Sequence, residues 1–363
     1  MNIEAIFSDN AAVKSILAIL KKEADPLREY RIMEVCGTHT MSIARHGIKS
    51  LIPSNIKLVS GPGCPVCVTA QADLDNCIEL TRKENTVVVS FGDMLKVKAS
   101  DGHSLSGARS EGADVRIIYS PLDTLKMAAN EPNKHFAFIA VGFETTTPMA
   151  AGLIKTAAQR GLGNISVLSI CKRMPPALSL LISDKTAKID GFLCPGNVTV
   201  ITGTSIYAPL VGAGRAAVVT GFEPMDILSS VLEAIRQINT GNFKVVNNYT
   251  RAAKDEGNIR ARTLTEEVFE PSNARWRGLG LLEGSGLALK KIYETHDTMK
   301  VFSLDPLRPE KATACSCGDI LMGHISPLDC PLFDTVCIPE NAVGPCMVSS
   351  EGACAAYYKY RTI

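Results

Sequence analysis

The chain has 363 residues, of which 46% are hydrophobic and 21% charged, as in a folded globular protein. This length exceeds what one ordinary hydrophobic core holds, so two or three domains are expected. Lys and Arg number 38 against 37 for Asp and Glu, and no basic run is interleaved with aromatic residues. This charge pattern argues against a nucleic acid as the partner.

The beginning of the chain, MNIEAIFSDN, lacks a cationic region followed by a long apolar stretch. Nowhere do about 18 apolar residues run together, so we expect neither a signal peptide nor a membrane-spanning helix. The predicted location is the cytoplasm. Most of the 12 cysteines would stay reduced there, so their clustering indicates metal binding or thiol chemistry more than a disulfide framework.

The first part of the chain alternates strands and helices, a pattern typical of a parallel sheet. Apolar spacing predicts helices at residues 11–24 and 71–83, and strands at residues 31–35, 56–59, 86–90 and 115–119. Cys36 and His39 directly follow the strand at 31–35. Cys64 and Cys67, in GPGCPVC, directly follow the strand at 56–59. Because carboxyl ends of parallel strands line one crevice, we expect three thiols and an imidazole to converge there, with a preference for iron, copper or zinc.

A similar plan recurs further along the chain. Predicted strands lie at residues 138–141, 166–170, 191–194 and 216–220, and each half closes on a proline and an aspartate that open a helix. We interpret this as two similar α/β units, residues 1–125 and 126–241, that face each other across a cleft. GFETTTP at 142–148 follows one of these strands. Its side chains either cap a helix or bind a polar ligand, and the residues assigned to a ligand cleft are Thr38, Glu144, Thr145 and Thr146.

Residues 242–363 differ in composition, and the alternation of strands and helices fades after Gly241. Six cysteines fall between prolines and glycines near the end: Cys315, Cys317, Cys330, Cys337, Cys346 and Cys354. Their spacing lacks the paired two-residue knuckles of zinc sites, whereas an iron–sulfur cluster tolerates irregular spacing. A small, irregular third domain held by a metal centre is therefore expected. Cys77, Cys171 and Cys194 stand alone and are predicted to be buried apolar residues.

The thiol loops also have simpler interpretations. A C-x-x-C pair in a cytosolic protein is typically a structural zinc site or a redox pair. Cys36 and His39 weigh against that interpretation, although His39 by itself is typical of a hydrogen-bonded structural histidine.

The motifs EVCGTHT, GPGCPVCVT, VGFETTTP, EGNIRA, RWRGLG and GPCMVSSEGACAAYYKY resemble those of the HypD family of hydrogenase maturation factors across nearly the whole chain. The resemblance implies a scaffold that, with the chaperone HypC, assembles the Fe(CN)2CO unit of [NiFe] hydrogenases. It also implies that cyanide comes from the HypE thiocyanate, made with HypF, and that the finished unit passes to the hydrogenase large subunit. The implied fold is two α/β domains and a third domain with a [4Fe-4S] cluster.

The resemblance also implies roles for individual residues. Iron is assigned to Cys36, Cys64 and Cys67, with His39 close by but not needed as a ligand. The four cluster ligands are assigned as Cys315, Cys330, Cys337 and Cys354. Cys317 and Cys346 are left as a redox disulfide that passes electrons from the cluster towards Cys64 and Cys67, where cyanide release from a thiocyanate needs them. On spacing alone, these two cysteines are equally well explained as ordinary reduced thiols.

Two other hypotheses compete with the scaffold. The first is an iron–sulfur thiol/disulfide oxidoreductase resembling ferredoxin-thioredoxin reductase, with Cys64 and Cys67 as exchange thiols. The second is a zinc-stabilised binding module without redox activity. Zinc alone would support the module, one cluster without further iron the reductase, and a cluster with extra iron the scaffold.

Overall fold

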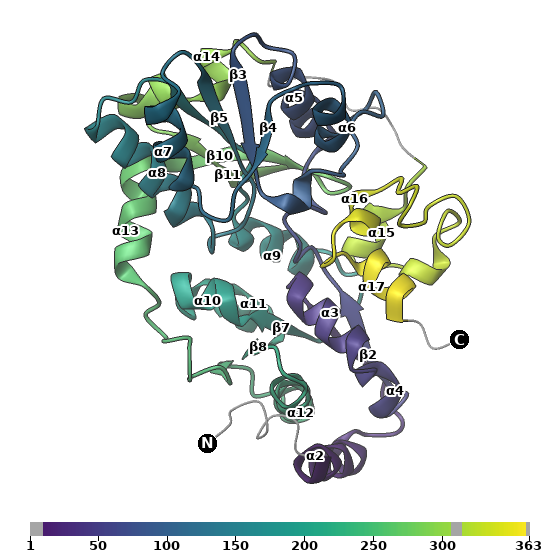
Figure 1. The fold of residues 1–363 in the computed structure, drawn as a ribbon. Coiled ribbons are helices and arrows are strands. Elements are labelled where there is room, and N and C mark those ends of the chain that lie inside the picture. The colour runs from purple at the N-terminus through teal and green to yellow at the C-terminus, as the bar shows by residue number, and fades with distance from the viewer. Residues whose placement is uncertain (1–9, 306–313, 361–363) are drawn as a thin grey trace.

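A computed structural model describes residues 10–305 and 314–360. It contains two parallel β-sheets with helices on their faces, a long antiparallel hairpin, and a short helical segment that carries the terminal cysteines (Figure 1). The mixed α/β class and the parallel sheets confirm the prediction from the alternation of strands and helices.

The first sheet has five strands in the order β2-β1-β7-β8-β9, and every neighbouring pair is parallel. Its strands are β1 (Tyr30–Glu34), β2 (Ile56–Ser60), β7 (Gly191–Pro195), β8 (Ala216–Thr220) and β9 (Val245–Asn247). One face is covered by helices α2 (Asn10–Glu23), α3 (Gly37–Arg45), α4 (Ile48–Leu51) and α12 (Pro224–Thr240).

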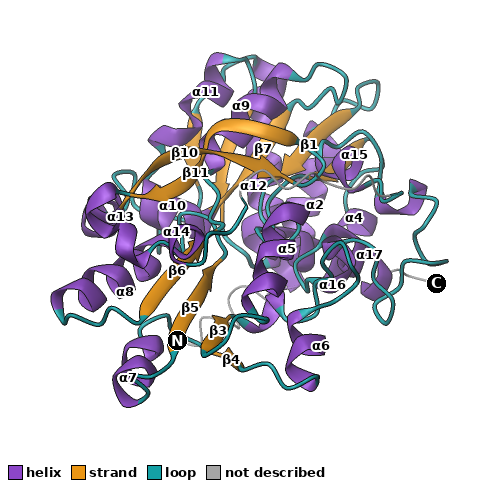
Figure 2. Cartoon of the chain, turned by 90° about the horizontal axis from the view of Figure 1, so that it is seen from above, coloured by secondary structure: helices purple, strands orange, loops and turns teal. Residues whose placement is uncertain are grey.

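The second sheet has four parallel strands in the order β4-β3-β5-β6. Its strands are β3 (Thr86–Ser90), β4 (Val115–Ile117), β5 (His135–Ala140) and β6 (Ile165–Ser169). Seen from above, the two sheets are separate groups of strands (Figure 2). The helices in this part of the chain are α5 (Gln71–Leu80), α6 (Leu105–Ser110), α7 (Asp123–Asn130), α8 (Thr147–Gln159) and α9 (Met174–Ser183).

The sheets divide the chain differently from the expected boundary at residue 125. The chain builds β1 and β2, crosses to the second sheet for β3 to β6, and returns to the first sheet for β7 to β9. Sequence pattern does not reveal this order, because strands in a sheet buried on both faces have the same continuous apolar character whichever neighbour they pair with. The return path is completed by α10 (Gly196–Thr202) and α11 (Ala208–Gly212).

Residues 242–305 were expected in the cysteine-rich domain, but they join the α/β part. Helix α13 (Ile259–Val268) packs on α8, and the hairpin β10 (Phe269–Trp276) and β11 (Gly280–Leu289) bridges to Lys172 and Thr69. Trp276 is fully buried, and its indole N–H donates to Ser285 Oγ at 2.9 Å. Helix α14 (Thr298–Val301) follows and contacts β6.

The cysteine-rich unit is therefore the segment from residue 314 to residue 360. It contains α15 (Cys317–Leu321), α16 (Pro345–Val348) and α17 (Ala353–Tyr360), and α17 packs against α3 (Figure 1). One hydrophobic core runs from both sheets into this unit and includes Cys64, Cys67 and five of the terminal cysteines. Throughout residues 10–305 and 314–360, every helix is too short or too polar to cross a bilayer.

Candidate functional site

The two thiol loops lie side by side, as predicted, because β1 and β2 are parallel neighbours. Cys36 follows β1 at the start of α3, and the GPGCPVC loop follows β2. Backbone hydrogen bonds join the loops: Gly61 N–H donates to Glu34 C=O at 2.8 Å, and Gly37 N–H donates to Gly63 C=O at 3.1 Å. The carboxyl ends of two neighbouring strands thus bring the two loops into one fixed arrangement.

Gly63 allows this close approach. A Cβ atom added at Gly63 would lie 2.1 Å from the backbone nitrogen of Cys36 and 2.3 Å from its Cα atom. These distances are far below van der Waals contact, so any side chain would push the loops apart.

Cys36 lines a cavity of about 320 Å³ between the first sheet and the GFETTTP loop. The cavity is also lined by Thr145 and Thr146 from that loop, by Asn197 at the start of α10, and by Glu351 from the terminal segment. The cavity thus lies between loops that follow strands of both parallel sheets. Sequence reasoning missed Asn197 and Glu351, although Asn197 lies just after the predicted strand at 191–194 and Glu351 lies in the motif GPCMVSSEGACAAYYKY.

The Cys36 thiol is almost fully buried, with 4% of the residue exposed. Burial, reinforced by the nearby carboxylate of Glu351, raises its pKa to about 12. The thiol donates to Asn197 Oδ1 at 3.8 Å. Cys36 is therefore a neutral thiol in the free protein, and a metal that binds it must displace the proton.

Cys64 and Cys67 face a different neighbour. Cys64 Sγ donates to Ser349 Oγ at 3.3 Å, and the Cys67 amide donates to Cys64 Sγ at 3.3 Å. The Cys67 thiol interacts with those of Cys346 and Cys64, and burial together with these two thiols raises its pKa well above the usual range. Neither Cys64 nor Cys67 lines the cavity at Cys36.

The three thiols assigned to iron are thus close in the fold but turned in different directions. Among the described residues, no three His, Cys, Asp or Glu side chains have the geometry for a single metal ion. A turn of helix-like hydrogen bonds, from Val68 N–H to Cys64 C=O and from Thr69 N–H to Val66 C=O, fixes the backbone of the CPVC loop in this orientation.

His39 occupies a structural position on α3. It is fully buried, its Nε2 lies 3.1 Å from the Thr220 carbonyl oxygen, and its ring stacks at a tilt against Phe222. Burial lowers the pKa of His39 to about 4, so the ring is neutral at physiological pH. The histidine joins α3 to the end of β8 and does not line the cavity.

The residues assigned to the ligand cleft have different environments. The Thr38 hydroxyl donates to Glu351 Oε1 at 2.6 Å, and Glu144 Oε1 accepts from the Met174 amide at 2.9 Å. Burial raises the pKa of Glu144, whose Oε2 has no partner among the described residues. The Thr146 hydroxyl donates to the carbonyl of Phe143 at 3.3 Å. Only Thr145 and Thr146 of this set line the cavity.

The terminal cysteines gather in one buried region. Burial raises the pKa of Cys354, and the negative charges that Cys346, Cys337 and Cys330 would carry raise it further. The Val343 amide donates to Cys337 Sγ at 3.3 Å. For Cys330, burial alone would raise the pKa, but amide groups led by that of Ser316 hold it below its usual range. Cys330, Cys337, Cys346 and Cys354 are thus close enough for their charges to interact, and amide groups donate to the sulfur atoms of Cys330 and Cys337.

All 12 cysteines are free in this structure, including Cys317 and Cys346, for which the resemblance implied a disulfide. Cys317 lies beside Cys315 and Arg277. A hydrogen bond from the Cys315 thiol, helped by the positive charge of Arg277, lowers the pKa of Cys317 to about 6.

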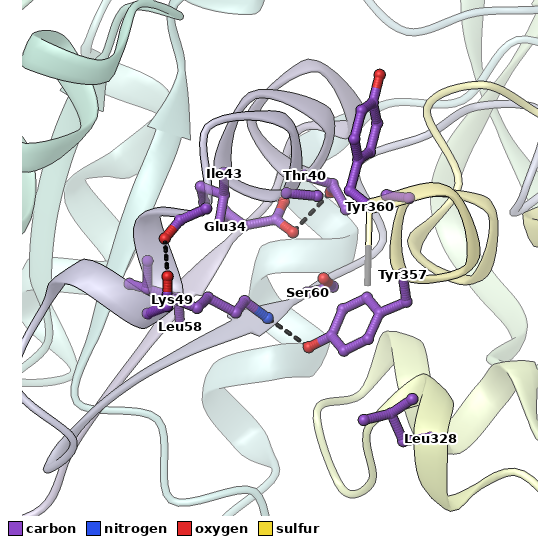
Figure 3. A pocket seen from close by; sticks show the side chains of 13 residues that line it. Glu34, Thr40, Ile43, Lys49, Leu58, Ser60, Leu328, Tyr357 and Tyr360 are labelled. Atoms are coloured by element: carbon purple, nitrogen blue, oxygen red, sulfur yellow. Dashed lines mark hydrogen bonds between the residues drawn. The ribbon is translucent and has the colours of Figure 1, made fainter. Parts of the chain in front are cut away.

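A buried carboxyl group lies directly beneath Cys36. Glu34 Oε1 accepts from the Thr40 hydroxyl at 2.6 Å, and Oε2 accepts from the Cys36 amide at 3.4 Å. Glu34 also lines a separate cavity of about 270 Å³ near α17, in which Lys49 donates to the Tyr357 hydroxyl (Figure 3). Burial, partly offset by the hydroxyls of Thr40 and Ser60, raises the pKa of Glu34 from 4.5 to about 8.

The raised pKa of Glu34 predicts a pH-dependent stability. Between pH 4.5 and 8 the folded protein holds a proton on Glu34 that the unfolded chain has lost, so this group lowers stability as pH rises. One unit of pKa corresponds to about 1.4 kcal/mol. As pH rises through this range, we therefore expect the free energy of unfolding of Glu34→Gln to increase by about 2 to 4 kcal/mol relative to that of the wild type.

Urea unfolding of the two proteins at several pH values measures this difference. Glu84→Gln, a change at a loop glutamate, is the matched control, and its unfolding free energy should follow that of the wild type. Parallel curves for Glu34→Gln and the wild type would show that Glu34 is ionised in the folded protein.

Comparison with known proteins agrees with the motifs. The family model HypD, described as "Hydrogenase formation hypA family", matches residues 11–361. A hydrogenase maturation factor HypD of Azotobacter vinelandii is 43% identical over 361 residues, which cover 98% of this chain and 95% of the relative. A HypD of Cupriavidus necator is 40% identical over 363 residues, covering 98% and 96%. A putative hydrogenase expression/formation protein of Methanocaldococcus jannaschii is 40% identical over 357 residues, covering 98% and 99%.

Proposed function

Because the chain belongs to the HypD family of hydrogenase maturation factors, we propose that it is the scaffold on which the Fe(CN)2CO unit of [NiFe] hydrogenases is assembled. In this proposal the iron unit is the cargo. HypC shares the iron and contacts the chain near Cys36, HypE delivers cyanide from its thiocyanate, which is made with HypF, and the hydrogenase large subunit receives the product.

The observation that carries the proposal is the position of Cys36. Its thiol lies at the junction of two loops from neighbouring strands, on the wall of a cavity of about 320 Å³. Iron that accepts cyanide and carbon monoxide needs a soft anionic ligand, open coordination positions and little water. Cys36 offers the soft ligand, the cavity leaves room for further ligands on the metal, and its mostly apolar lining favours little water.

Cys64 and Cys67 have a second role in this proposal, as a dithiol. Transfer of cyanide from a protein thiocyanate consumes two electrons: the S–CN bond breaks, the HypE sulfur leaves as a thiol, and cyanide is released as an anion. Two thiols that become a disulfide supply those electrons together with two protons, one of which protonates the HypE sulfur. The interaction of the Cys67 thiol with both Cys64 and Cys346 supports this role, because Cys346 is then within reach for thiol–disulfide exchange.

The implied resident cofactor is a [4Fe-4S] cluster, held by Cys315, Cys330, Cys337 and Cys354. When bound, such a cluster supplies electrons singly at low potential. The chain's own contribution is the pair Cys317 and Cys346, which in the oxidised protein would form the redox disulfide. Arg277 favours the thiolate of Cys317, the form that attacks a disulfide.

The test is an infrared spectrum of the protein purified without oxygen after co-expression with HypC, HypE and HypF. We expect cyanide and carbonyl stretching bands, and iron in excess of that in the cluster. Omission of HypE is the matched control and should remove the cyanide bands. A wild-type complex with normal folding and no bands would contradict the scaffold proposal.

A second candidate function is an iron–sulfur thiol/disulfide oxidoreductase. The contact between Cys67 and the terminal thiols favours it, because the CPVC pair would then exchange with a partner's disulfide. The same preparation separates the two functions: one cluster without further iron, together with reduction of a protein disulfide by the isolated chain, supports the reductase.

A further inference from the structure

Resting on the proposed function, we propose that Asn197 is a ligand-contacting residue of the cargo site. Its side-chain Nδ2 donates a hydrogen bond to the nitrogen of an iron-bound cyanide, and the hydroxyl of Thr145 on the opposite wall is a second donor. The two residues follow strands of different sheets: Thr145 follows β5 and Asn197 follows β7. Because both groups are hydrogen-bond donors, they favour cyanide over carbon monoxide at the positions that they face.

The orientation of the Asn197 carboxamide follows from its surroundings. Oδ1 accepts from the Val198 amide at 2.9 Å, at the first turn of α10. A backbone N–H can only donate, so the atom that faces it must be the oxygen. The same Oδ1 also accepts from the Cys36 thiol at 3.8 Å. Nδ2 is thus left as a donor, and it has no partner in the part of the chain that the structure describes.

Asn197 is distinctive among the residues that line the cavity. It carries the only side-chain N–H on that wall, because the other lining residues are apolar, acidic, thiol or hydroxyl groups. The Thr146 hydroxyl is occupied by the carbonyls of Phe143 and Val141. The Thr145 hydroxyl has no partner in residues 10–305 or 314–360, which leaves it as the available hydroxyl donor.

Cyanide and carbon monoxide on iron differ in how well they accept hydrogen bonds, and the cavity offers both donors and apolar groups. Iron-bound cyanide keeps a lone pair and negative charge on nitrogen, so it is a strong hydrogen-bond acceptor, and a hydrogen bond to a charged group contributes more than one between neutral groups. The oxygen of iron-bound carbon monoxide is a poor acceptor and is better placed against apolar groups. Valine, phenylalanine and methionine side chains supply such a surface, among them Val66, Phe143 and Met174.

The experiment compares infrared spectra of the complex loaded as described above. Asn197→Asp keeps the size and the acceptor for the Val198 amide but removes the N–H, and Asn197→Leu removes both polar atoms. Thr145→Val removes the second donor. Thr156→Val is the matched control, because Thr156 lies on α8 and does not line the cavity. Thermal unfolding of each unloaded variant checks its fold.

We expect at least one cyanide band to shift in both Asn197 variants and another to shift in Thr145→Val, while the bands of Thr156→Val stay at their wild-type positions. Cyanide bands at wild-type positions in either Asn197 variant would overturn the inference, and the scaffold proposal would stand. Complete loss of all bands from both folded Asn197 variants would also overturn it, because Asn197 would then be needed for holding the iron itself. Absence of bands in the wild type would instead refute the proposed function.

Discussion

Cys36→Ser protein, co-expressed with its partners, is expected to lose the cyanide and carbonyl bands and to reduce hydrogenase maturation by at least about 100-fold. A serine hydroxyl is a hard, weakly acidic ligand and does not replace a thiolate on iron. The fold should persist, since serine can make the same hydrogen bond to Asn197 Oδ1. The free energy of unfolding should therefore change by about 1 kcal/mol.

Cys77→Ser is the control for this experiment. Cys77 is as buried as Cys36, but it lies within α5 and does not line the cavity. A comparable loss of stability with the bands retained is expected. If Cys36→Ser still matured hydrogenase, Cys36 would not be the iron ligand.

Gly63→Ala is expected to destabilise the junction of the two thiol loops strongly. The added Cβ atom would lie 2.1 Å from the Cys36 nitrogen, so the two loops must separate and the hydrogen bond from Gly37 N–H to Gly63 C=O must break. Overpacking of this kind costs about 3 kcal/mol. Urea unfolding measures this loss, and faster alkylation of Cys36 should report that its thiol has become exposed.

Gly92→Ala is the matched control, because Gly92 also follows a parallel strand. A Cβ atom at this position meets no atom within 4 Å. Its unfolding free energy should stay within about 0.5 kcal/mol of the wild type. An equally small effect at Gly63 would mean that the loops are not packed against each other in solution.

In the proposed function, the groups that would hold the cargo and the thiols that would exchange electrons meet at the GPGCPVC loop. Its Gly63, Pro65 and Val66 line the cavity beside Cys36, whereas Cys64 and Cys67 face the terminal segment. Cys67 is therefore only a few loop residues away from the residues that line the cavity at Cys36.

The sequence by itself determined the local structure and the family. Apolar runs and turn residues located every parallel strand near its observed position except the short β9, and they placed both thiol loops at strand ends. The long motifs identified the family over the whole chain. Such features are local, since a strand, its turn and the following helix depend on residues within about ten positions of each other.

The tertiary structure decided which strands pair and what each thiol faces. The apolar pattern of a buried strand does not indicate which strand it pairs with. The pattern therefore could not predict that β1 pairs with β7 or that the chain crosses between the sheets. The contacts of Cys36 with Asn197, of Thr38 with Glu351 and of Cys64 with Ser349 join residues 161, 313 and 285 positions apart. Contacts over such distances arise only from packing, because no periodicity in one sequence relates such distant residues.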